Sequence, residues 1–425
     1  MKSYNNPDQK TLKRLCARTE IESTSLDATI KAIFEQVRWA GDEALLSYTQ
    51  KFDDVSLESC EISMKEARAT ARKTPKELKQ AIKAAAKNIQ TFHESQIQQV
   101  KRIETAPGVV CWQEPRSIKT VGLYVPGGSA PLMSTVLMLG VPARIAGCQE
   151  IVLCTPPNKD STVDSAICYA ALLVGVTKII RIGGAQAVAA LSIGTESVPK
   201  VDKIFGPGNQ YVTAAKIYAQ NFGVAIDMPA GPSEVMVIAD KFARPQFVAA
   251  DLLSQAEHGP DSQAVLISTD EHMVKKVNQE VERQLKVLPR QKIARKAIDR
   301  SFCIVFNRLE SAFGFADAYA PEHLILNVRK PESYIGNIRN TGSVFIGQYT
   351  PESAGDYASG TNHTLPTGGW ARSYGGISLD SFVKKVTFQS ITEAGLRSLA
   401  PTITTLATAE GLEGHARSIS IRFDN

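Results

Sequence analysis

The hydrophobic residues in the first part of the chain recur at helical spacing. One stripe runs from Leu26 to Val37 in steps of three and four residues, and a longer stripe runs from Leu78 to Phe92. Such stripes predict amphipathic helices that pack one face on a core. Between them, Ser63-Met64-Lys65-Glu66 has the form of a capping box, which marks the start of a helix. We therefore expect the chain to be helical up to about Gln99.

Beyond Lys119 the pattern predicts alternating strands and helices. Between Thr120 and Gln149 the only charged residue is Arg144, so we expect burial on most sides, as in a parallel sheet covered by helices. Apolar runs followed by glycine-rich or proline-rich turns mark the strands, and helices are expected between them. The predicted strands are Thr120–Val125, Glu150–Cys154, Lys178–Ile182 and a fourth that ends near Phe205.

A second alternating block begins at Glu234. This repetition predicts an α/β protein with two domains built on open parallel sheets. After Gly347 the periodicity stops, and Gln348–Gly369 predicts a long irregular loop, a feature that is often functional. The predicted elements of this block are a helix at 246–257, strands at 234–238, 264–267, 303–306, 324–328 and 343–346, and later helical stretches at 401–410 and 411–422.

Composition and charge narrow the class of protein. The 425 residues include 48 Lys and Arg against 43 Asp and Glu, and the net charge of +5 is not gathered into a tail, so nucleic acid is not the expected partner. No apolar run approaches the ~18 residues of a membrane span, and the polar first residues lack the apolar segment of a secretory signal. Seven widely spaced cysteines without a CxxC pattern favour reduced thiols. We expect a soluble cytoplasmic protein.

Four of the six histidines lie in contexts that could serve chemistry. His93 falls on the polar side of a helical stripe and His272 in the first turn of a helix, so both are expected at the surface. The other four are His258, His323, His363 and His415.

Gln255 and His258 are three residues apart near the end of a predicted helix, hence on one face. With Asp356 and His363 from the irregular loop and His415, they could form a nitrogen and oxygen site that suits zinc, with manganese or cobalt as alternatives. The spacing is no standard zinc motif, and isolated His and Asp residues usually have structural roles, so the residues alone leave a metal site open.

Glu322 and His323 stand side by side at the entrance of an apolar strand. They could act as two proton-transfer groups, because a histidine pKa of about 6.5 suits a base near neutrality; a solvated turn is the alternative. Cys154 at a strand end could be a nucleophile, but a buried thiol is the favoured interpretation.

Three glycine-rich turns follow strands. Ligands of open α/β sheets bind outside the carboxyl ends of strands, and glycine lets a phosphate approach the backbone. None of the turns matches G-x-G-x-x-G, and tight strand-to-helix turns explain the glycines equally well. The turns are Pro126-Gly127-Gly128-Ser129, Gly183-Gly184-Ala185-Gln186 and Gly206-Pro207-Gly208-Asn209.

These segments together resemble the histidinol dehydrogenase family, from about Ala40 to Arg422. The first ~20 residues match poorly. The motifs that carry the resemblance are VGLYVPGG at 121–128, KIFGPGN at 203–209, DMPAGPSE at 227–234, DLLSQAEHGPDSQ at 251–263, PEH at 321–323 and PESAGDYASGTNH at 351–363.

The resemblance implies a homodimer with two related, incomplete Rossmann-like domains. It also implies that the C-terminal segment crosses to the partner subunit, where Glu410 and His415 complete the neighbouring site. The implied division is a small N-terminal segment at 1–20, a first α/β domain for substrate and zinc at 21–126 and 233–377, a second α/β domain on the NAD side at 127–232, and the exchanged segment at 378–425.

The resemblance further implies which residues form the site. One zinc ion per subunit would be held by Gln255, His258, Asp356 and His415. NAD would contact Tyr124, Gln186 and Asn209. Glu322 and His323 would be the catalytic pair, and the substrate L-histidinol would contact Ser233, Glu410, His323 and the four zinc ligands.

The implied reaction oxidises L-histidinol twice, through the aldehyde to L-histidine. Two alternatives stay open at this point. One is a related enzyme of the same fold that oxidises another primary alcohol, such as a sulfonated diol; the presence of Glu410 and the whole zinc set favours histidinol. The other is a metal- or nucleotide-binding protein without activity, and the intact Glu322 and His323 argue against it.

Overall fold

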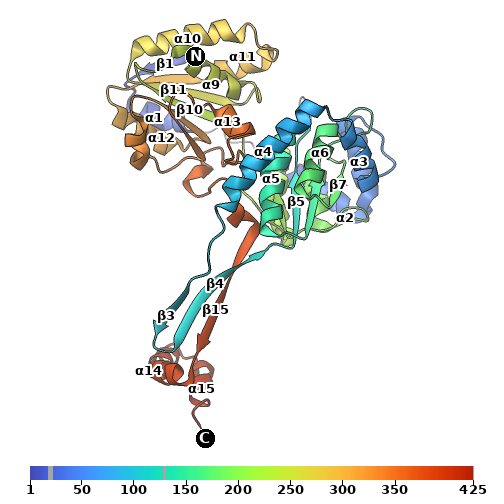
Figure 1. Ribbon diagram of the computed structural model, residues 1–425, viewed down its shortest axis with the longest axis vertical. Helices are drawn as coiled ribbons and strands as arrows, with labels where there is room; N and C mark the ends of the chain where they lie inside the picture. The colour runs from blue at the N-terminus through green and yellow to red at the C-terminus, as the bar shows by residue number, and fades with distance from the viewer. Residues whose placement is uncertain (18–22, 128–130, 425) are drawn as a thin grey trace. The chain divides into compact units, whose positions relative to one another are not determined.

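The computed structural model describes residues 1–17, 23–127 and 131–424. They form two compact units, one made of Met1–Gln96 and Ile118–Phe382 and the other of Ile97–Ser117 and Val383–Asn425. Figure 1 shows the α/β character of the first unit, which confirms the predicted fold class. Gly128 and Ser129 of the first glycine-rich turn lie outside the described residues.

Within the described residues, the first unit contains two six-stranded sheets. All neighbours in the first sheet are parallel. Its central strand β10 is buried at every position, as expected for a parallel sheet covered on both faces. In spatial order the strands are β1 (Lys2–Asn5), β12 (Phe302–Val305), β11 (Gln263–Ser268), β10 (Glu234–Ala239), β13 (His323–Asn327) and β14 (Ser343–Ile346).

Helices cover both faces of the first sheet, and each face has its own apolar core. One core includes residues of α9 (Pro245–Ala256), α10 (Glu271–Leu285) and α11 (Gln291–Arg300). Figure 1 shows these helices together above the sheet. The other core includes α12 (Leu309–Tyr319), with α1 (Gln9–Cys16) packed against it.

The second sheet is also parallel, except where β2 meets β7. In spatial order its strands are β2 (Glu61–Ile62), β7 (Lys178–Ile180), β6 (Glu150–Cys154), β5 (Thr120–Tyr124), β8 (Lys203–Phe205) and β9 (Ala225–Ile226). Its two cores are formed with α3 (Met64–Arg72), α4 (Lys76–Glu94), α5 (Met133–Ala146) and α6 (Ser165–Val174), and with α2 (Ser23–Asp53), α7 (Gly184–Ile193) and α8 (Gln210–Ala219).

Strand pairing differs from the expected division of the chain. Thr120–Tyr124 lies at the centre of the second sheet, although 21–126 was expected with the first α/β domain. The first residues, Lys2–Asn5, form the edge strand of the first sheet rather than a separate segment. The reason is that β2 and the helices α2, α3 and α4 bury their apolar faces on the second sheet.

The predicted irregular stretch after Gly347 contains one short helix, α13 (Glu352–Tyr357). Three-residue to seven-residue 3-10 turns occupy Gln220–Phe222, Pro331–Asn337, Trp370–Arg372 and Leu379–Phe382.

The capping box is confirmed, since the Ser63 side chain accepts a hydrogen bond from the Glu66 amide. His272 is exposed as expected, in a helix capped by Asp270.

His93 is a wrong prediction, because its side chain is fully buried. Its Nδ1 lies 3.0 Å from Gln96 Oε1, and its Nε2 lies 3.3 Å from the amide nitrogen of Asn362. Asn362 belongs to the long loop after Gly347, which covers the polar side of α4 at this point. Helical periodicity alone could not show that a second segment covers this face.

The second unit is a three-stranded antiparallel sheet with two helices, α14 (Glu393–Ala409) and α15 (Glu413–Ser420). Trp112 and Phe388 stack across neighbouring strands with ring centroids 5.4 Å apart. The strands, which the sequence pattern did not predict, are β15 (Val383–Ile391), β4 (Val109–Ser117) and β3 (Arg102–Ala106).

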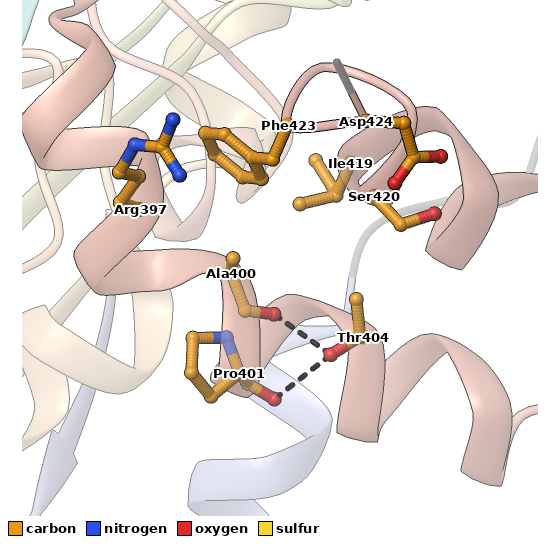
Figure 2. A pocket seen from close by; sticks show the side chains of 8 residues that line it. All are labelled: Arg397, Ala400, Pro401, Thr404, Ile419, Ser420, Phe423 and Asp424. Carbon is orange, nitrogen blue, oxygen red and sulfur yellow. Dashed lines mark hydrogen bonds between the residues drawn. The ribbon is translucent and has the colours of Figure 1, made fainter.

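An open hollow of about 430 Å³ lies between the two helices of this unit and the residues after them. Figure 2 shows Thr404 Oγ1 donating to the carbonyls of Ala400 and Pro401 at its floor. The Arg397 guanidinium stacks over the Phe423 ring, 4.4 Å from its centroid.

Candidate active site

Buried polar residues gather at the amino edge of the first sheet. Glu322 and His323 lie where β13 begins, next to Glu234 at the start of β10. A helix that follows a parallel strand runs back along the sheet, so the end of α9 reaches this same edge. Gln255, in the last turn of α9, is almost fully buried there, and His258 follows it at the surface.

The His323 imidazole is surrounded by acceptors. Its Nδ1 lies 3.1 Å from the Glu234 carbonyl oxygen and 3.5 Å from Glu322 Oε2. The Glu322 carboxylate accepts a hydrogen bond of 2.8 Å from the Glu234 amide, which fixes it beside the ring. His323 and Glu322 are only 4% and 6% exposed, so any proton exchange between them occurs out of bulk solvent.

The carboxylates around His323 favour the charged form of its imidazole. Burial lowers the pKa of His323, but the carboxylates of Glu322 and Glu352 outweigh it and raise its pKa to about 10. The Asp356 carboxylate acts in the same direction, with Oδ1 3.8 Å from Nε2.

Three side chains could supply metal ligands at this edge. One ligand atom each from His258, Glu352 and Asp356 lies within 4.8 Å of the others. Asp356 Oδ1 and His323 Nε2 are buried and have no hydrogen-bond partner among the described residues. Because a buried polar atom without a partner is costly, these atoms fit a site completed by a cation or a polar ligand.

Gln255 takes part in the same network through its side-chain amide. With the amide oriented to satisfy its neighbours, the nitrogen donates to the Glu352 carboxylate and the oxygen accepts from the Glu234 amide at 3.2 Å. An amide oxygen has two lone pairs, so this arrangement leaves one of them for a metal ion. The donor set of imidazole, carboxylate and amide oxygen suits zinc and related divalent ions.

Glu352 is a site residue that the sequence analysis missed. Its side chain is 1% exposed, and Oε1 lies 3.9 Å from His323 Nδ1. Glu352 and Asp356 are four residues apart on α13 and therefore lie on one helical face. This spacing directly after Pro351 was a usable signal, but the surrounding Ser and Gly residues hid the helix.

His363 supports the site from the long loop. Its Nδ1 lies 2.9 Å from the Asp356 carbonyl oxygen, and its Nε2 lies 3.2 Å from Thr135 Oγ1 on α5. Burial lowers the pKa of His363, which favours a neutral ring that links Asp356 to α5. The structure therefore gives His363 a place beside a candidate ligand.

The candidate NAD residues come together at the carboxyl edge of the second sheet. Tyr124 ends β5, and its hydroxyl accepts a hydrogen bond of 3.1 Å from the Gly184 amide; burial raises the pKa of Tyr124 to about 12. Gln186 is buried in the first turn of α7, which follows β7. Asn209 follows β8 and caps α8, with Oδ1 accepting from the amides of the next turn.

The remaining predicted site residues are placed as follows. Ser233 directly precedes β10 at the amino edge of the first sheet. Glu410 and His415 are exposed on the second unit, at the end of α14 and in the first turn of α15. Cys154 is fully buried, and desolvation raises the pKa of its thiol, which confirms the expected buried thiol.

In the described part of the chain, every helix is too short or too polar to cross a membrane.

Comparison with known proteins shows which family the chain resembles along its length. The sequence profile of the histidinol dehydrogenase family matches residues 16–423. The chain is 51% identical to a histidinol dehydrogenase of Bacteroides fragilis over 424 residues, covering 100% of this chain and 99% of the relative. It is 50% identical to a chloroplastic histidinol dehydrogenase of Arabidopsis thaliana, covering 99% and 91%.

A solved structure extends the similarity to three dimensions. The crystal structure of histidinol dehydrogenase from Elizabethkingia anophelis superposes with a TM-score of 0.97 at 52% sequence identity, covering 100% of this chain and 98% of the other. Similarity of this extent along the whole chain includes both sheets and the segments that carry the candidate site. The chain therefore belongs to the histidinol dehydrogenase family.

Proposed function

We propose that this protein oxidises L-histidinol through L-histidinal to L-histidine, the last step of histidine biosynthesis, with two NAD reduced per substrate. One observation carries the proposal: the buried Glu322–His323 pair lies beside the cluster of His258, Glu352 and Asp356, in a chain about half identical to histidinol dehydrogenases over its full length.

Zinc and NAD are the cofactors in this proposal. Gln255, His258 and Asp356 would hold zinc, and His415 from a second copy of the chain would complete the ligand set in a homodimer. The exposure of Glu410 and His415 on a separate unit is consistent with such an exchange. When bound, zinc would supply a fixed positive charge that orients the substrate nitrogens and offsets the carboxylates around His323.

The proposed contact residues complete both binding sites. Ser233 at the start of β10 and Glu410 would bind the substrate. Tyr124, Gln186 and Asn209 at the carboxyl edge of the second sheet would bind NAD, which accepts a hydride in each oxidation.

His323 is the proposed base for both oxidations. With its Nδ1 facing the Glu234 carbonyl, Nε2 is the nitrogen that can take a proton. It would remove the hydroxyl proton as hydride leaves the alcohol carbon. Glu322, held by the Glu234 amide, would take a proton from the water that attacks the aldehyde. As the water attacks, His323 would return its proton to the aldehyde oxygen, so that it can then deprotonate the hydrated aldehyde as the second hydride leaves.

The deciding experiment counts NADH per histidinol in the zinc-loaded protein. We expect two equivalents, histidine as product, and loss of activity on chelation. Glu322→Gln should keep the first oxidation and damage the second, whereas Glu332→Gln, an exposed control, should behave as wild type. Equal loss of both steps in Glu322→Gln would refute the division of labour between Glu322 and His323. No NADH from histidinol would refute the proposed substrate.

A further inference from the structure

A buried ion pair lies next to the second sheet of the first unit. The proposed function assigns no role to either of its residues. Lys216 on α8 pairs with Asp227, which directly follows β9. Their side chains are 2% and 0% exposed. Burying two charges carries a large desolvation cost, and such a pair is often no more stabilising than two apolar side chains of similar volume. Fold stability alone therefore gives a poor account of this pair.

The pair holds both backbone groups of one residue, Gly206. Lys216 Nζ donates to the Gly206 carbonyl at 2.8 Å, and the Gly206 amide donates to Asp227 Oδ2 at 2.8 Å. Asp227 Oδ1 pairs with Lys216 and also accepts from the Met228 amide at 2.7 Å. Hydrogen bonds to charged groups are the stronger kind, so the Gly206 peptide groups are tightly fixed.

Gly206 can occupy this place because it lacks a side chain. Its φ is +126°, a region that favours glycine, and a Cβ atom would collide with the Tyr124 carbonyl oxygen. Gly206 also begins the turn Gly206-Pro207-Gly208-Asn209, whose last residue caps α8, the helix that carries Lys216. The ion pair therefore holds the start of this turn through Gly206, and α8, which carries Lys216, begins at the end of the turn. Gly206 also lies directly against the backbone of Tyr124.

We propose that Lys216 and Asp227 are positioning residues for NAD. They fix the turn at Gly206 and so hold Asn209 and the neighbouring Tyr124 in the geometry that binds the cofactor. This inference rests on the proposed function, because it takes Tyr124 and Asn209 as NAD contacts. It adds two residues that touch neither cofactor nor substrate and act through the Gly206 peptide.

The test uses the full-length, zinc-loaded enzyme and measures NADH binding by fluorescence titration together with steady-state kinetics. The main variant is Lys216→Met/Asp227→Leu, which replaces both charges by apolar side chains and should keep the fold. Because it removes the charged partners of both Gly206 backbone groups, we expect the dissociation constant for NADH and the KM for NAD to rise about tenfold or more. The kcat at saturating NAD and the KM for histidinol should change little.

Two further variants separate positioning from stability. Asp227→Asn keeps an acceptor oxygen for the Gly206 amide and should show a smaller rise in the NADH dissociation constant. Lys178→Met removes the half-buried ion pair with Glu61 at the β2–β7 edge, and should lower the melting temperature without changing NADH binding.

An unchanged NADH dissociation constant in the double variant, with only a lower melting temperature, would overturn the inference. If the double variant does not fold, an unchanged constant in Asp227→Asn would overturn it equally. Wild-type protein that fails to bind NADH would overturn the proposed function and this inference together. Wild-type binding with unaffected variants would overturn the inference alone.

Discussion

Replacing Glu352 by glutamine should lower the pKa of His323 in the metal-free enzyme. Glu352 Oε1 lies 3.9 Å from His323 Nδ1, and both side chains are almost fully buried. Burial lowers the pKa of His323, but nearby carboxylates, Glu322 first and Glu352 second, raise it to about 10. Glutamine keeps the volume of Glu352 and one acceptor oxygen but removes its charge, so the change isolates one electrostatic contribution.

The size of the effect follows from the distance. Two unit charges at about this separation attract by about 4 kcal/mol at an effective dielectric constant of about 20. Since one pKa unit corresponds to about 1.4 kcal/mol, the contribution of Glu352 is at most about 3 units. Desolvation raises the pKa of Glu352 to about 8, so this carboxylate is ionised in the range where His323 titrates. The pKa of His323 in Glu352→Gln should therefore fall from about 10 towards neutrality.

The assay is NMR titration of the imidazole C–H signals in the metal-free, full-length protein. The chain has six histidines, and loss of a signal in His323→Asn identifies the relevant one. Glu332→Gln, an exposed carboxylate on a 3-10 turn, is the matched control and should leave that titration unchanged. A His323 pKa that is the same in wild type and Glu352→Gln would refute the argument, because the carboxylate would then exert no field on the ring.

Two other buried groups give predictions about stability. Burial raises the pKa of Asp251 to about 7, so the folded state binds a proton that the unfolded state has lost above about pH 4. The unfolding free energy should fall by up to about 4 kcal/mol as pH rises through this window, and urea titrations of Asp251→Asn should lack that slope. His93→Ala should lower the unfolding free energy by about 2–4 kcal/mol, because it leaves a cavity and removes a contact with Asn362; an unchanged melting temperature would contradict this.

The central strands of both mainly parallel sheets were predictable because they are mostly apolar and buried on both faces, whereas the edge strands β1, β2 and β9 were not predicted. β6 and β14 have the predicted bounds, and each central strand is an uninterrupted apolar run beside a turn. The antiparallel strands of the second unit were not predicted. β3 is mostly exposed, and β4 beyond the buried Val109 mixes exposed and half-buried positions and contains Pro115. Without a strongly buried face, these strands lack the alternation that marks a half-buried strand.

The sequence identified most residues of the candidate site but not all of the residues that contact them. Glu322, His323, Gln255, His258 and Asp356 were named from the sequence, and the structure brings them to one edge of the first sheet. Glu352 escaped because the pattern around it suggested an irregular loop. The general rule for open α/β sheets also pointed elsewhere, since it places ligands at the carboxyl ends of strands. The candidate NAD residues follow that rule, whereas the candidate acid-base pair, Glu322 and His323, lies at the amino end of β13.

Contacts between segments remote in sequence hold the candidate site in place, and hydrophobic periodicity cannot reveal such contacts. The long loop after Gly347 contacts α5, which packs on the second sheet. His363 Nε2 lies within hydrogen-bond distance of Thr135 Oγ1, and the Asn362 amide donates to the Met138 carbonyl. Through His363, which contacts the Asp356 carbonyl, these ties reach a candidate metal ligand. A change in α5 should therefore alter the candidate metal site as well as the core around the helix. Such coupling depends on the packed arrangement of the two halves, which local sequence patterns do not encode.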